Sequence, residues 1–102
     1  MAVFLISFEL TEQSDDYRSF YSNLEGLGDI CPITLGTILL FSDFQLEEMV
    51  KNLSDYLRND DVLFILNLGT LDIGGINLPE CIDDYLTPYR GMSDDMRNEM
   101  QV

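Results

Sequence analysis

Carboxylates are the side chains of this sequence most able to do chemistry. The 102 residues include 19 Asp and Glu, 5 Lys and Arg, and no histidine. A chain without histidine lacks the commonest general base, the commonest metal ligand and every catalytic triad that uses imidazole. Its two cysteines cannot form a structural zinc site, which takes four nitrogen or sulfur ligands. The absence of histidine therefore excludes whole classes of enzyme.

The carboxylates do not follow a metal-binding pattern. They include four adjacent aspartate pairs, and none of these has the alternating spacing of a helix-loop-helix calcium site. Most pairs fall where a helix is predicted to begin or end, and the first pair complements a helix dipole at its amino end. We therefore expect no catalytic residue, no metal and no cofactor. The pairs are Asp15-Asp16, Asp60-Asp61, Asp83-Asp84 and Asp94-Asp95.

The apolar pattern predicts four strands and two helices. Continuous apolar runs indicate strands over 3–10, 30–33, 37–41 and 62–66. Pro32 cannot donate a ladder hydrogen bond, so the second run is predicted to be an edge strand. Apolar residues at three- and four-residue steps indicate helices over 17–27 and 46–57. Ser42 and Gln45 fit a capping box in front of the second helix.

This order of elements, joined by right-handed crossovers, predicts a ferredoxin-like βαββαβ sandwich of the α+β class. Its four-stranded antiparallel sheet is expected to carry both helices on one face. After the fourth strand, Pro79 at a first-turn position predicts a short C-terminal helix, and an extra edge strand over 73–78 is the alternative. Residues 1–88 are expected to form this domain, and 89–102 a polar, flexible tail.

Both faces of the predicted sheet are apolar. In the first strand Phe4, Ile6 and Phe8 point one way and Val3 and Leu5 the other, and the fourth strand alternates in the same manner. Two helices can cover only one face, and monomers rarely expose a large apolar patch. We therefore expect a two-fold homodimer in which a second copy covers the other face. The expected interface residues are Val3, Leu5, Leu63 and Ile65.

Over residues 1–86 the order of elements resembles the small CRISPR-associated adaptation subunit and its SinR-type and VapD-type relatives. The resemblance rests on the segments FLISFEL at 4–10, LGTILL at 35–40 and NDDVLFI at 59–65. It implies the ferredoxin-like fold and a homodimer. In the nuclease members an aromatic residue and an aspartate close the first strand, and the two aspartates of the dimer bind a divalent metal. The matching pair is Phe8-Glu9, so the resemblance implies, as an alternative function, a metal-dependent endonuclease with Glu9 as the Mg²⁺ ligand. Glu9 is one methylene longer than the family's aspartate.

The net charge of −14 indicates the kind of partner. Proteins that bind nucleic acid neutralise phosphates with Lys and Arg, so this chain should repel DNA and RNA. Spread along a globule about 34 Å across, the excess is one charge per ~2.4 Å, against one per ~1.7 Å in duplex DNA. We therefore expect a non-catalytic acidic module that inhibits a basic nucleic-acid-handling protein by mimicking nucleic acid, as small phage or mobile-element inhibitors do. The expected contact residues are Asp15, Asp16, Glu47, Glu48, Asp60, Asp61, Asp83 and Asp84.

The net charge also fits two different roles. The charge can simply keep a hydrophobic dimer soluble. It is also compatible with a structural dimer that scaffolds a larger complex.

The apolar amino end is far shorter than the ~20 residues that span a bilayer, so no membrane association is expected. Cys31 and Cys81 lie far apart without a secretion signal, which predicts two reduced, buried thiols and a cytoplasmic protein.

Overall fold

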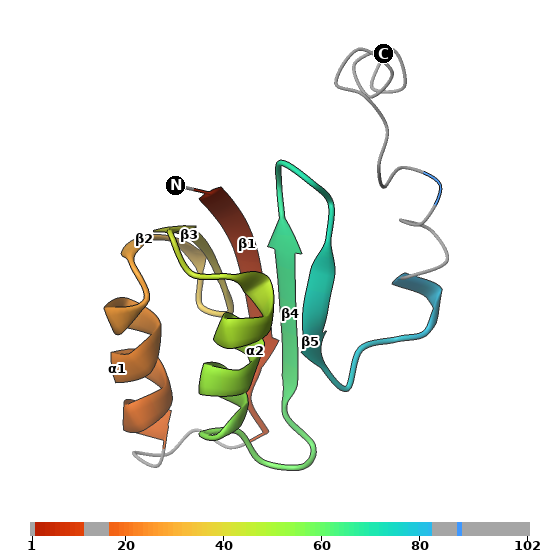
Figure 1. The fold of residues 1–102 in the computed structure, drawn as a ribbon. Helices are drawn as coiled ribbons and strands as arrows, with labels where there is room; N and C mark the ends of the chain where they lie inside the picture. The colour runs from red at the N-terminus through yellow and green to blue at the C-terminus, as the bar shows by residue number, and fades with distance from the viewer. Residues whose placement is uncertain (1, 12–16, 83–87, 89–102) are drawn as a thin grey trace.

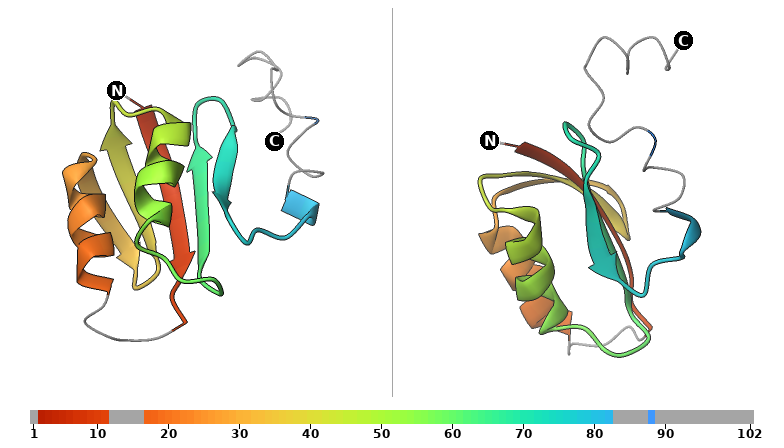
Figure 2. Two further views of the ribbon diagram at one scale, coloured as in Figure 1. Left: turned by 60° about the horizontal axis from the view of Figure 1, so that its bottom comes forward. Right: turned by 45° about the vertical axis from the view of Figure 1, so that its right-hand side comes forward.

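The computed structural model describes residues 2–11, 17–82 and 88 of the chain. Five strands form one antiparallel sheet in the order β2-β3-β1-β4-β5, and both helices lie on the same face of it (Figures 1 and 2). In chain order the elements are β1 (Ala2–Glu9), α1 (Arg18–Gly26), β2 (Asp29–Thr34), β3 (Thr37–Ser42), α2 (Leu46–Ser54), β4 (Val62–Asn67) and β5 (Ile73–Ile76).

The predicted α+β class, the antiparallel sheet and the two helices on one face are confirmed, but the sheet has five strands instead of four. The additional strand, β5, pairs with β4 and is the extra edge strand that the sequence offered as an alternative. β2 lies at the opposite edge, as Pro32 indicated, and a bulge interrupts its register between Pro32 and Thr34. The predicted C-terminal helix lies mostly outside the described residues, and the predicted tail lies wholly outside them. The described part of this region includes a turn in which Ile82 N–H donates to Pro79 O at 3.3 Å.

The hydrophobic core lies between the two helices and one face of the sheet. The strand register places Ile6 of β1 between Ile38 of β3 and Ile65 of β4, so these three side chains form one layer under the helices. The helices contribute residues at three- and four-residue steps, as their predicted apolar stripes required. The buried hydrophobic residues are Phe4, Ile6, Phe8, Tyr17, Phe20, Leu24, Leu27, Ile38, Leu40, Met49, Leu53, Leu63 and Ile65.

The prediction that Leu63 and Ile65 belong to a dimer interface is wrong. Leu63 pairs with Phe8, and Ile65 pairs with Ile6. Directly opposed residues of an antiparallel pair share a face, so both β4 residues lie on the helix-covered side, where they are fully buried. The β4 residues that share the helix-free face with Leu5 are the neighbours in sequence, Phe64 and Leu66.

The capping-box prediction at Ser42 is also wrong. Gln45 precedes α2 as its N-cap, and no side chain there makes a capping hydrogen bond. Ser42 is instead a buried strand residue whose hydroxyl donates to Leu27 O at 2.6 Å and accepts from Phe44 N–H at 3.1 Å. It therefore ties the end of β3 to the end of α1.

Two glycines allow β5 to join the sheet. A Cβ on Gly75 would lie 2.0 Å from the carbonyl oxygen of Leu63 on β4. A Cβ on Gly74 would lie 2.8 Å from Cγ2 of Val50 on α2. β5 is thus held closely by a neighbouring strand on one side and by a helix above it.

Within the described residues, no helix has the length and apolar character needed to cross a membrane. The two cysteines are free, but both are exposed, so the prediction of buried thiols is wrong. Cys31 is exposed because β2 is an edge strand, and Cys81 because it lies in the turn after β5.

Candidate functional site

Carboxylates dominate the described surface. Eleven Asp and Glu residues fall in the described part of the chain, and all of them except Asp61 are exposed. The same part holds three basic residues, Arg18, Lys51 and Arg58, which gives it a formal charge of −8 (3 − 11). An exposed carboxylate keeps its hydration and its charge, so this surface presents acceptors to a cationic partner.

The predicted contact residues that the structure describes do not form one patch. Glu47 and Glu48 are exposed in the first turn of α2, where they also complement the helix dipole. Asp60 is exposed in the connection that follows the other end of α2. Asp15, Asp16, Asp83 and Asp84 lie outside the described residues.

Asp61 is wrongly predicted as a contact residue, because its carboxylate is fully buried. Oδ1 accepts three hydrogen bonds, from Thr11 N–H at 2.8 Å, Thr11 Oγ1 at 2.9 Å and Tyr17 Oη at 2.9 Å. Oδ2 accepts a fourth, from Arg58 N–H at 2.7 Å. The Asp61 carbonyl oxygen accepts from Nδ2 of Asn77 at 2.8 Å. One residue therefore joins the end of β1, the start of α1, the connection before β4 and the end of β5.

The ionised form of Asp61 is the stable one in the folded chain. Burial by itself raises the pKa of a carboxyl group, but the hydrogen bonds from Arg58, Thr11 and Tyr17 outweigh burial and hold the pKa of Asp61 below its ordinary value of 3.8. The Arg58 guanidinium also lies 5.5 Å from the centre of the Tyr17 ring. The sequence places Tyr17 at the start of the first predicted helix but does not identify the partner of its hydroxyl group, because no local signal links residues 44 positions apart.

Glu9, the residue implied as a metal ligand by the resemblance, is the exposed last residue of β1 and pairs with Val62. The described chain contains no group of three or more His, Cys, Asp or Glu residues placed to hold a metal ion. Glu9 therefore offers a single solvated carboxylate per chain.

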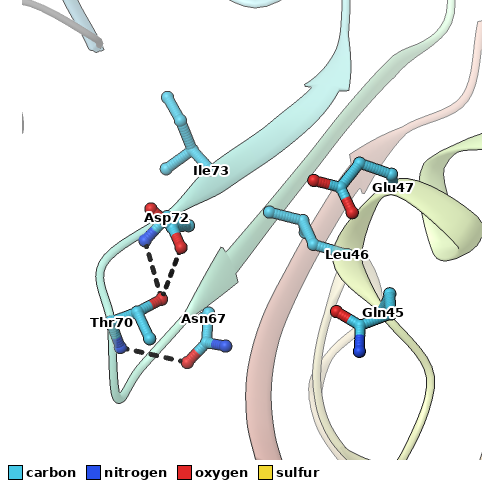
Figure 3. Close-up of a pocket in the computed structure, with 7 residues that line it drawn as sticks. All are labelled: Gln45, Leu46, Glu47, Asn67, Thr70, Asp72 and Ile73. Carbon is cyan, nitrogen blue, oxygen red and sulfur yellow. Dashed lines mark hydrogen bonds between the residues drawn. The ribbon is translucent and has the colours of Figure 1, made fainter.

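An open, polar pocket of about 420 Å³ lies between the start of α2 and the β4–β5 turn (Figure 3). Its two carboxylates belong to Glu47 and Asp72, and Oδ2 of Asp72 accepts from Thr70 Oγ1 at 3.0 Å. Oδ1 of Asn67 accepts from the backbone N–H of Gly69 and of Thr70, which fixes the turn. None of the lining residues is basic: they are Gln45, Leu46, Glu47, Asn67, Thr70, Asp72 and Ile73.

The helix-free face of the sheet is apolar over much of its three central strands, and Ser7 and Thr37 form a polar pair on it. Leu5 of β1 pairs with Leu39 of β3 and with Leu66 of β4, and each of these side chains is half-buried. Phe41 at the β3 end of this face is 38% exposed. Val3 and Leu5 therefore lie where the sequence predicted, on the side of the sheet opposite to the helices.

The β2–β3 hairpin ends in exposed aliphatic side chains. Leu35 in the turn is 97% exposed, and Ile33 in the bulge is 56% exposed. Turn positions usually hold Gly, Asn, Asp, Ser or Pro, so a leucine at this position was a usable signal that sequence reasoning missed.

No protein-family model, curated protein or solved structure matches this chain. Its function must therefore be argued from the chemistry of its own surface.

Proposed function

We propose that this protein is a non-catalytic acidic module that binds a basic nucleic-acid-handling protein and occupies the cationic surface that would otherwise hold phosphates. The observation that carries this proposal is the exposed carboxylate surface: ten of the eleven described carboxylates face solvent against three basic side chains. A partner that neutralises phosphates with Lys and Arg has the complementary charge.

The form of the acidic surface supports recognition by charge over a wide area. The exposed carboxylates come from both helices, from strand ends and from the connections between elements, and so present charge in several directions. Each exposed pair with a partner's Lys or Arg contributes little alone, so affinity requires many pairs together. Such binding is screened over about 8 Å at physiological ionic strength and must weaken as salt is added.

For the architecture, we propose a ferredoxin-like unit extended by one strand. The order β2-β3-β1-β4, with α1 between β1 and β2 and α2 between β3 and β4, supports this assignment, and β5 is the addition. We also propose a homodimer through the helix-free face. Its support is the half-buried apolar row of Leu5, Leu39 and Leu66, which no described helix covers.

The test of the function uses the full-length tagged protein as bait in a lysate of its own host. Bound proteins are eluted with a salt gradient and identified by mass spectrometry, and each is then purified. We expect a protein of high pI that elutes at moderate salt. Fluorescence anisotropy with a labelled duplex should then show that the acidic chain displaces nucleic acid from this protein.

Two results would contradict the proposal. If elution did not depend on salt, the binding would not be electrostatic. If the partner kept its nucleic acid while the acidic chain was bound, the chain would be a scaffold and not an inhibitor. Cleavage of RNA or DNA by the pure protein with Mg²⁺, lost on Glu9→Gln, would instead establish the endonuclease alternative.

A further inference from the structure

The tip of the β2–β3 hairpin carries an apolar surface that the fold itself does not use. Leu35 is 97% exposed, and it therefore contributes almost nothing to the core. Ile33, the extra residue of the bulge between Pro32 and Thr34, is 56% exposed. A serine or asparagine would serve the turn equally well, so these two side chains are not explained by stability.

The backbone of this tip is held in place. Phe8 N–H at the end of β1 donates to Gly36 O at 2.8 Å, and Gly36 N–H donates to Thr34 Oγ1 at 3.3 Å. A Cβ on Gly36 would lie 2.7 Å from Phe8 O, so only glycine allows this approach. Leu35 is thus presented next to Gly36 on a fixed turn, and little backbone entropy would be lost when a partner binds it.

Charge is absent from the hairpin beyond Asp29, the first residue of β2. No Asp, Glu, Lys or Arg occurs from Ile30 to Ser42, in a chain where charged residues make up 24% of the sequence. Glu9 follows Phe8, the β1 residue whose N–H donates to Gly36 O, and its side chain is exposed. The tip is therefore an apolar projection with a carboxylate beside its base.

We propose that Leu35 and Ile33 form an apolar anchor that enters a hydrophobic pocket on the basic partner, with Lys or Arg at the rim of that pocket facing Glu9. This inference rests on the proposed function and names the surface through which it acts. Many weak exposed ion pairs attract the two proteins but fix no single orientation, whereas a desolvated side chain in a pocket fixes one.

A second copy of this chain would bring the wrong charge to the anchor. A polar pocket in its described residues contains two carboxylates, Glu47 and Asp72, and no basic residue in its lining. A copy of the same chain would bring a further charge of −14 toward Glu9. A cationic partner provides the opposite charge, and this is why we assign the anchor to it.

The test places the photo-crosslinking residue p-benzoylphenylalanine at position 35 of the full-length protein in its own host. Position 68 is the matched control, because Leu68 is also an exposed leucine in a turn, at 44% exposure, but lies at the opposite end of the sheet. Thermal melts equal to wild type show that both labelled proteins are folded. We expect position 35, and not position 68, to give one discrete adduct with a basic protein, whose crosslinked peptide holds apolar residues with Lys or Arg next to them.

The substitution Leu35→Ser then measures the anchor's effect on affinity for the crosslinked protein. We expect about tenfold weaker binding or more, with the melting temperature and the salt dependence unchanged. Leu68→Ser should leave the affinity within about twofold. An unchanged affinity for Leu35→Ser would overturn the proposal.

The remaining outcomes separate this inference from the proposed function. An adduct with a second copy, with a non-basic protein, or no adduct at all would overturn the anchor. If a basic protein were still captured in the salt gradient in these cases, the acidic module would stand without its anchor. If no basic protein were captured, both proposals would fail.

Discussion

Oη of Tyr17 donates a hydrogen bond to Oδ1 of Asp61 at 2.9 Å, across 44 residues of sequence. Thr11 donates to the same oxygen through both its N–H and its hydroxyl group. This carboxylate is therefore a structural junction in a protein whose other described carboxylates all face solvent.

Asp61→Asn should destabilise the fold by about 2 kcal/mol, because four hydrogen bonds to a buried, charged acceptor are weakened or lost. Urea unfolding followed by circular dichroism measures the change. Asp60→Asn is the control: Asp60 is the exposed neighbour, and its substitution should change the free energy of unfolding by no more than about 0.5 kcal/mol. If both variants changed the free energy of unfolding equally, the proposed structural role of Asp61 would be contradicted.

The effect of Asp61→Asn should depend on pH. The pKa of Asp61 is lower in the folded chain than its ordinary value of 3.8, so the unfolded chain binds more protons in acid. The stabilisation from Asp61 is fully present above pH 3.8 and is lost as the pH falls through the folded-state pKa. The difference in unfolding free energy between wild type and variant should therefore be constant at neutral pH and shrink below pH 3.8. If the difference in unfolding free energy grew in acid, the prediction would be contradicted, because folding would then raise the pKa of Asp61 instead of lowering it.

Gly75→Ala should destabilise the protein by about 2 kcal/mol, because the added Cβ would collide with the Leu63 carbonyl oxygen, 2.0 Å away, and force β5 from β4. Gly26→Ala at the end of α1 is the matched change, since nothing lies within 4 Å of the Cβ there. It should be neutral, or stabilising by up to about 1 kcal/mol. Thermal or urea unfolding of the two variants decides between these expectations.

Leu5→Glu should convert a homodimer into a monomer, because it places a charge at the centre of the helix-free face. Size-exclusion chromatography with light scattering measures the mass. Ser22→Glu adds the same charge to an exposed position on α1 and should leave the mass unchanged. A wild-type protein that is monomeric at micromolar concentration would refute the proposed dimer.

The double variant Glu47→Gln/Glu48→Gln should bind the captured basic partner about fivefold more weakly and elute at lower salt, since two exposed charges in the first turn of α2 are removed. Glu25→Gln/Asp29→Asn removes the same charge from the end of α1 and the start of β2. A larger loss from the first pair would locate the contact near α2. No loss from either pair would contradict recognition by carboxylates.

The sequence predicted most of the sheet because its strands are long apolar runs. Two of these runs are apolar on both faces and therefore predict central strands: Val3 to Phe8 and Val62 to Leu66. The structure places both inside the sheet. β5 was only an alternative, because a four-residue strand with two central glycines shows neither periodicity nor β-forming side chains at its centre. The position of β5 depends on the close approach of Gly75 to Leu63 and of Gly74 to Val50. These contacts form only in the folded chain, so the local sequence does not reveal them.

The faces of the strands were harder to predict than the strands. Alternation shows that Leu63 and Phe64 point in opposite directions, but the side that each takes depends on the register with β1, which is set by the whole sheet. Asp61 was misassigned for a similar reason. Beside Asp60 it reads as one half of a solvated pair, and only the folded chain brings Thr11 and Tyr17 to it.

The proline in β2 limits how this sheet can grow. Pro32 provides no backbone donor, and the bulge that follows breaks the register of the strand, so another chain cannot continue the ladder at that edge. β5 is at the other edge of the described sheet. Strand-to-strand association through these edges would thus end at two molecules, which protects a chain rich in aliphatic strands from propagating into fibrils.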